Sequence, residues 1–137
     1  MYHYRFIAIG LLLLFFGCLQ NEVTLVEQTK TIPENEILSW WFDAVKGNTI
    51  VINATVTNGG PIDIFFVDEN GYVGYVNKLN GGVQGFTSIA HDVGITKYTR
   101  EIIIDKPGKY YVVVDNTAVE GTSPTGSVII KIKITKK

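Results

Sequence analysis

The feature that most constrains this chain is its excess of β-branched aliphatic residues. Beyond residue 17 the chain holds 15 Val and 15 Ile against only 4 Leu and 4 Ala. Branching at Cβ restricts χ1 and suits the pleated surface of a strand, whereas Leu and Ala favour helices. The chain from Cys18 onward is therefore expected to form an all-β domain.

Turn-forming residues divide this part of the chain at short intervals. Lys106-Pro107-Gly108 is one such turn, since Pro presets φ and Gly accepts a positive φ. The expected strands cover residues 23–32, 37–44, 49–57, 62–67, 72–77, 97–105, 109–115 and 127–135, with a weaker strand at 85–89. Short strands separated by turns are typical of a sandwich or barrel. No helical period of useful length is visible.

The period-two alternation within these segments predicts which side chains form the core. Aliphatic residues occupy every second position in 49–57 and 127–135, and Trp40, Phe42 and Ala44 alternate in the same way. Lys131 and Lys133 are expected on the solvent side. The segment 109–115 is apolar at both alternations, which predicts a strand covered on both sides.

The first 17 residues have a different character. An apolar run extends from Phe6 to Phe16 and follows a single permanent charge, Arg5. Such a run is short for a bilayer core of about 30 Å and is typical of a secretory signal. Gly17-Cys18 resembles the lipobox of prokaryotic lipoproteins, in which the Cys becomes the lipidated N-terminus. An uncleaved signal anchor, or an ordinary signal with a chance Cys, remains open.

These features predict a lipoprotein signal peptide at 1–17, a short tether at 18–22 and a β-sandwich domain at 23–137. Lipid on Cys18 would anchor the domain extracytoplasmically, at the cell membrane. The formal net charge of −1 gives no basic footprint for nucleic acid. Because Cys18 is the single cysteine, an intrachain disulfide and a Cys-based zinc site are excluded.

Three segments occur in an order that resembles a known family. Residues 41–47 read WFDAVKG, residues 60–66 read GPIDIFF and residues 107–116 read PGKYYVVVDN. The chain is similar in these segments to the pre-peptidase C-terminal domain of bacteria and archaea, and more loosely to the GOLD domain of cargo proteins. The resemblance implies a single antiparallel β-sandwich of jelly-roll type, here with about eight strands. Some members are appendages of secreted proteases or bind calcium or matrix.

Trp41, Phe65 and Tyr111 are large aromatic residues that the alternation places on the outward face. Their strands are expected to be neighbours, so the three side chains are candidates for a partner-binding patch. The alternative is that the Gly-rich segment 79–95 folds back and covers them.

Other candidate sites are weaker. Asp68, Asn70 and Asp115 offer oxygen ligands of the kind that calcium prefers, but they lack EF-hand spacing. Asn53-Ala54-Thr55 is an N-glycosylation sequon on an outward strand position. His91, the single histidine beyond the signal, is expected in a solvated loop. No other metal ligand set and no cofactor are predicted.

The sequence favours a non-enzymatic module that binds a protein partner or an envelope glycan. The alternative is a carbohydrate- or calcium-binding module of the kind appended to secreted enzymes. A small hydrolase is the least favoured reading, because no strained nucleophile turn such as Gly-x-Ser-x-Gly accompanies His91.

Overall fold

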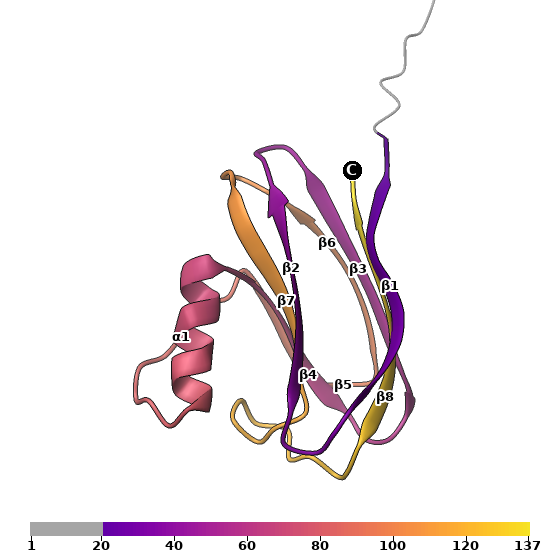
Figure 1. Ribbon diagram of the computed structural model, residues 1–137, viewed down its shortest axis with the longest axis vertical. Coiled ribbons are helices and arrows are strands. Elements are labelled where there is room, and N and C mark those ends of the chain that lie inside the picture. Colours follow the sequence, from indigo (N-terminus) through magenta and orange to yellow (C-terminus); the bar gives the residue numbers. More distant parts are fainter. Residues whose placement is uncertain (1–20) are drawn as a thin grey trace, which may run out of the picture.

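The strands of this protein form two four-stranded antiparallel sheets that pack face to face (Figure 1). The structure, a computed structural model, describes residues 21–137. The first sheet has the order β1 (Val23–Ile32), β8 (Val128–Lys136), β3 (Thr49–Asn58) and β6 (Lys97–Ile103). The second sheet has the order β2 (Ile37–Ala44), β7 (Gly108–Asp115), β4 (Ile62–Asp68) and β5 (Ala90–Ile95).

The order of the strands is that of a jelly roll. Strands β1 to β4 alternate between the two sheets, β5 stays beside β4, and β6 to β8 alternate again. Each neighbouring pair is antiparallel. This arrangement confirms the predicted eight-stranded sandwich, because a double-sheet jelly roll is built from two such four-stranded sheets.

The core between the sheets is formed by the inward positions of the strands, as the alternation predicts. The inward aliphatic residues of β3 and β8 are buried except Val56, which is half-buried. Trp40 is also half-buried, and its indole Nε1 donates to Gln28 Oε1 of the other sheet over 3.5 Å. β7 is apolar on both faces and lies between β2 and β4, which confirms its central position.

The structure corrects the predicted strand at 72–77, which is instead part of helix α1 (Glu69–Leu79). Asp68 begins the helix, because its side-chain oxygen accepts from the Gly71 N–H over 2.8 Å as an N-cap. Residues at helical spacing then point to the second sheet, namely Tyr72, Tyr75, Val76 and Leu79. Figure 1 shows α1 on the side of that sheet opposite to the sandwich core.

A second correction concerns the segment after α1. The weak strand expected at 85–89 is absent, and β5 forms from 90 to 95 instead. His91 consequently lies in β5 with a half-buried ring, not in a solvated loop. Its ring packs edge-on against Phe65, with 4.5 Å between the centroids. None of the helices in the described part of the chain has the length and hydropathy to cross a bilayer.

Candidate functional site

The outward face of the second sheet carries a small apolar core of its own. Phe65, Val67 and Val113 are fully buried there beneath Tyr75 of α1. The phenol ring of Tyr75 lies 5.1 Å from that of Phe65, measured between centroids, and Phe86 from the loop after α1 contacts both rings. The helix and this loop therefore cover a face that would otherwise expose large apolar side chains.

This cover corrects the predicted partner-binding patch. Phe65 is fully buried, Tyr111 is half-buried and Trp41 is 60% exposed. The alternation placed all three on the outward face correctly, and Trp41 and Tyr111 are direct cross-strand partners. An exposed patch made of all three does not form, because α1 and the segment that follows it lie over Phe65.

A smaller aromatic surface remains at the flank of α1, and it consists of Trp41, Tyr72 and Tyr111. The rings of Tyr72 and Tyr111 are stacked with 4.0 Å between their centroids and 2° between their planes. The hydroxyl groups of Tyr72 and Ser39 are 3.2 Å apart and share a hydrogen bond. Trp41 extends beside this stack, and the Lys109 ammonium lies 4.6 Å from the centroid of the indole ring.

These contacts hold Tyr72 and Tyr111 in place on the second sheet. Tyr72 is held by the helix, and Tyr111 by the central strand β7. An interface that needs little ordering on binding retains more of its contact energy. Tryptophan and tyrosine are also the residue types most enriched among the side chains that dominate binding energy.

A buried hydrogen-bond group attaches α1 to the sheet. The Tyr75 hydroxyl donates to Asp115 Oδ2 over 2.8 Å, and the Thr117 N–H donates to Asp115 Oδ1 over 2.6 Å. Burial raises the pKa of Asp115, although these two hydrogen bonds act in the opposite direction. Burial and the negative charge of Asp115 likewise raise the pKa of Tyr75. This group is structural, since Asp115 is only 1% exposed.

A second buried carboxylate, Asp63, orders the loop between β7 and β8. Asp63 is the cross-strand partner of Asp115. Its carboxylate accepts from the Gly94 N–H over 2.8 Å, and from the hydroxyl and N–H of Thr122. The loop also contacts α1, because Glu120 and Lys78 form an ion pair of 2.5 Å. Both buried carboxyl groups, Asp63 and Asp115, are thus satisfied by hydrogen bonds.

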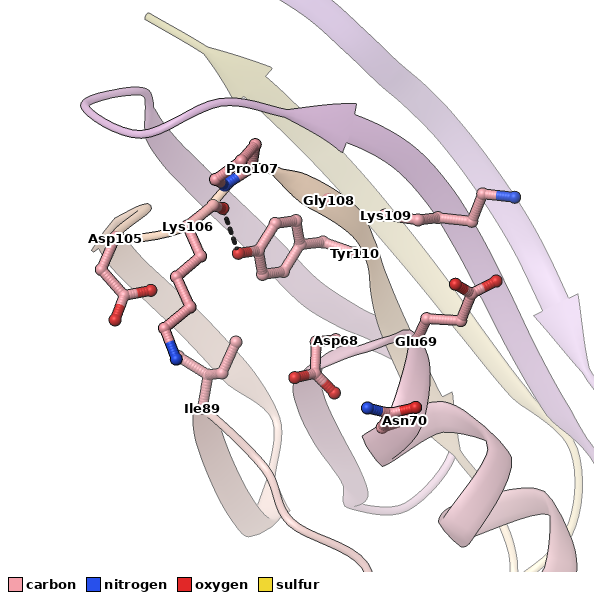
Figure 2. Close-up of a pocket in the computed structure, with 10 residues that line it drawn as sticks. All are labelled: Asp68, Glu69, Asn70, Ile89, Asp105, Lys106, Pro107, Gly108, Lys109 and Tyr110. Carbon is pink, nitrogen blue, oxygen red and sulfur yellow. Dashed lines mark hydrogen bonds between the residues drawn. The ribbon is translucent and has the colours of Figure 1, made fainter.

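A cavity of about 350 Å³ lies where the start of α1 faces the turn between β6 and β7 (Figure 2). Asp68 and Asn70 come from the helix side, and Asp105 and Lys106 from the turn. The Tyr110 hydroxyl donates to the Lys106 carbonyl oxygen over 2.6 Å, which stabilises the turn. Three acids and two lysines are mixed in this lining, so no charge sign dominates it.

The predicted calcium ligands are not brought together. Asp68 and Asn70 share the cavity of Figure 2, but Asp115 lies at the other end of β7, where its partner is Asp63. Asp68 is already the N-cap of α1, and Asp115 already accepts two hydrogen bonds. Among residues 21–137, no group of three or more His, Cys, Asp and Glu side chains could hold a metal ion.

The remaining candidate residues are placed as follows. Asn53 is exposed on the outward face of β3, so the sequon is accessible, and its modification stays a prediction. Cys18 lies outside the described residues. His91 Nε2 is buried with no hydrogen-bond partner, so within residues 21–137 this atom is not joined to a nucleophile or an orienting acid.

Comparison with known proteins gives similarity at the level of structure. No family model and no curated protein matches the chain. The fold is similar to that of PliG from Aeromonas hydrophila, a periplasmic inhibitor of g-type lysozyme. The TM-score is 0.53 at 11% identity, over 82% of this chain and 85% of that chain. Yersinia pseudotuberculosis-derived mitogen matches with a TM-score of 0.46 at 14% identity, over 82% of this chain and 84% of the mitogen. The first of these similarities shows a shared β-sandwich fold.

Proposed function

We propose that this protein is a non-enzymatic extracytoplasmic module that binds a protein partner through the aromatic surface of Trp41, Tyr72 and Tyr111. The observation that carries the proposal is the exposure of Trp41. Trp41 is 60% exposed on the outward side of β2, beside a stacked tyrosine pair, so most of its surface takes no part in either core. Its burial in a complex would remove a large apolar area from water.

Two further points support a protein partner, and a third supports a binding role in general. The Aeromonas hydrophila protein that shares the fold is a lysozyme inhibitor, so a sandwich of this kind serves there as a protein ligand. The Lys109 ammonium at the edge of the indole ring adds a charged group at the rim, where interfaces are usually polar. The resemblance to the pre-peptidase C-terminal domain also favours a binding role over catalysis.

A glycan is the second candidate for the same surface. The stacked rings of Tyr72 and Tyr111, with Trp41 beside them, offer flat aromatic faces against which the apolar face of a sugar ring can pack. A glycan ligand would make the protein a carbohydrate-binding module of the kind appended to secreted enzymes.

Neither a protein partner nor a glycan requires calcium at this surface. Calcium binding would appear in a titration as a raised melting midpoint, since a ligand of the native state stabilises it.

The test compares two exposed apolar residues on opposite sheets. The full chain is expressed with Trp41→Ala or with Ile103→Ala, and envelope proteins are captured after chemical cross-linking. Ile103 is 75% exposed at the end of β6 and is the matched control. We expect Trp41→Ala to lose a protein that wild type and Ile103→Ala retain, with the melting midpoint nearly unchanged. Equal capture by all three proteins would contradict the proposal, and loss of glycan capture alone would assign the surface to a glycan.

We also propose that a lipid on Cys18 holds the module at the membrane. The support is the Gly17-Cys18 junction at the end of a short apolar run, together with a domain whose first strand begins at Val23. Cys18→Ser should release the protein from the membrane fraction. A Cys18→Ser protein that stays membrane-bound at its full-length mass would show that the apolar run is an uncleaved anchor.

A further inference from the structure

The outward face of the first sheet carries two adjacent rows of polar side chains that cross all four strands. The first row consists of Thr29, Lys131, Thr55 and Lys97. The second row consists of Glu27, Lys133, Asn53 and Thr99. All eight side chains are exposed except that of Lys133, which is half-buried. We call these eight residues the polar face. Figure 1 shows α1 against the other sheet, so the helix leaves this face open.

The charge of the polar face is opposite in sign to that of the whole chain. It holds three lysines and one acid, whereas the chain has a formal net charge of −1. Lys133 pairs with Glu27 over 3.6 Å. Within residues 21–137, Lys131 and Lys97 have no carboxylate at ion-pair distance, so both ammonium groups are available to an anion. The lysines flank Thr55 from the two neighbouring strands.

A groove of about 380 Å³ lies on this face. Its lining combines ammonium, hydroxyl, amide and carboxylate groups from three strands, namely Glu27, Asn53, Thr55, Lys131 and Lys133. The backbones of Lys131 and Lys97 are two strand spacings apart, about 10 Å. Two cations at that separation suit charges repeated along a polymer better than a single small anion. The threonines and Asn53 between them both donate and accept hydrogen bonds, as sugar hydroxyls require.

We infer that the polar face binds a linear anionic polysaccharide, with Lys131 and Lys97 contacting its acidic groups and the threonines and Asn53 contacting its hydroxyls. A lipid surface fits less well, because neither row carries an apolar side chain that could enter the acyl region. Single-stranded nucleic acid fits less well too, since neither row offers an aromatic ring for base stacking. The inference does not depend on the proposed function, which uses the opposite sheet.

Polygalacturonate, a linear polymer of uronic acid, is the probe for this inference, with neutral dextran for comparison. We expect wild type to bind polygalacturonate and not dextran, and to lose binding as salt is raised toward 1 M, where the Debye length is about 3 Å. The double variant Lys97→Gln/Lys131→Gln should bind about five- to tenfold more weakly, as for two exposed ion pairs. Neither lysine packs in the core, so the variant should melt as wild type does.

The control variant Lys46→Gln/Lys106→Gln removes the same charge from two exposed turn residues outside the polar face. It should retain wild-type affinity for polygalacturonate. An equal loss in both lysine double variants would overturn the inference, because it would show a response to net charge alone. No binding of polygalacturonate at low salt would overturn it too. Tighter binding to phosphatidylglycerol vesicles than to polygalacturonate would assign the face to a membrane instead.

Discussion

The outward faces of the two sheets differ although the sheets share one core. On the first sheet the residues of the polar face are Thr, Asn, Lys and Glu, and no element within residues 21–137 covers them. On the second sheet they include Phe65, Val67 and Val113, which are fully buried under α1. Alternation therefore predicts the side of the sheet on which a residue lies. The polarity of the outward residues determines whether another element must pack over that side.

The comparison predicts the largest effect at the covered face. Phe65→Ala should lower the free energy of unfolding by about 3–5 kcal/mol, because it removes a fully buried ring that contacts Tyr75 and Phe86. Thr55→Ala, an outward substitution on the first sheet, should change it by less than about 0.5 kcal/mol. Urea unfolding measures both values. Similar small changes at both positions would show that α1 does not cover Phe65 in solution.

Loss of the hydrogen bond that joins α1 to the second sheet should have a smaller effect on the free energy of unfolding. Tyr75→Phe keeps the ring and removes the hydroxyl that donates to Asp115, which leaves a buried carboxylate oxygen without this donor. The expected loss is about 1–3 kcal/mol of unfolding free energy. Tyr72→Phe is the matched control, since its hydroxyl pairs with the exposed Ser39. If both variants lose the same amount, the Tyr75–Asp115 hydrogen bond does not hold the helix.

The pH dependence of stability should also reflect Asp115. Burial raises the pKa of its carboxyl in the folded state above the ordinary value of about 3.9. Above the raised pKa the buried carboxyl group is charged, which lowers the free energy of unfolding. This loss disappears as the pH falls through the raised pKa toward the ordinary value, because the group becomes neutral in the folded state. Wild type should thus gain stability relative to Asp115→Asn on acidification from pH 7. A relative loss over the same range would show a lowered pKa instead.

The smallest effect is expected at the open face. Lys133→Ala should stay within about 0.5 kcal/mol of wild type, because its 3.6 Å pair with Glu27 is largely in solvent. The neighbouring substitution Ile132→Ala removes a fully buried side chain and should lower the unfolding free energy by about 2–5 kcal/mol. Thermal and urea unfolding measure both. Equal losses of unfolding free energy in the two variants would show that the inward and outward positions of β8 are assigned one residue out of register.

The strands of the core could be predicted because their information is local. In β8, Ile130 and Ile132 alternate with Lys131 and Lys133, and this pattern alone fixes which side is inward. In β7 the residues of both alternations are apolar, and this local pattern predicts a central strand in the same way. Such patterns can be interpreted from one segment alone, without knowledge of the neighbouring strands.

The sequence pattern does not indicate helix α1, because its residues disfavour a helix locally. Gly71 and Gly74 lower helix propensity, and Val73 and Val76 favour strands. The two glycines are needed for another reason, since the loop after α1 passes so closely that a Cβ at either would contact Thr87 or Phe86. The available signal was Asp68 as an N-cap followed by Tyr72, Tyr75, Val76 and Leu79 at helical spacing.

The candidate site was predictable only where strand alternation alone determines the position of a residue. Trp41 could be placed outward from alternation, and its exposure follows. The burial of Phe65 depends on α1, and the stack of Tyr111 on Tyr72 joins residues from a helix that the pattern did not reveal. Contacts between separate elements of this kind are not encoded in the period of one strand.

Site-specific photo-cross-linking tests the central claim, that the aromatic surface beside α1 binds a partner, most directly. Photoreactive benzoylphenylalanine is placed at position 41 of the full chain, or at position 103 on the first sheet, and native envelopes are irradiated. Both positions are well exposed, Trp41 at 60% and Ile103 at 75%. We predict one adduct of defined mass from position 41 and none from position 103. No adduct at 41, or the same adducts at both positions, would contradict the account.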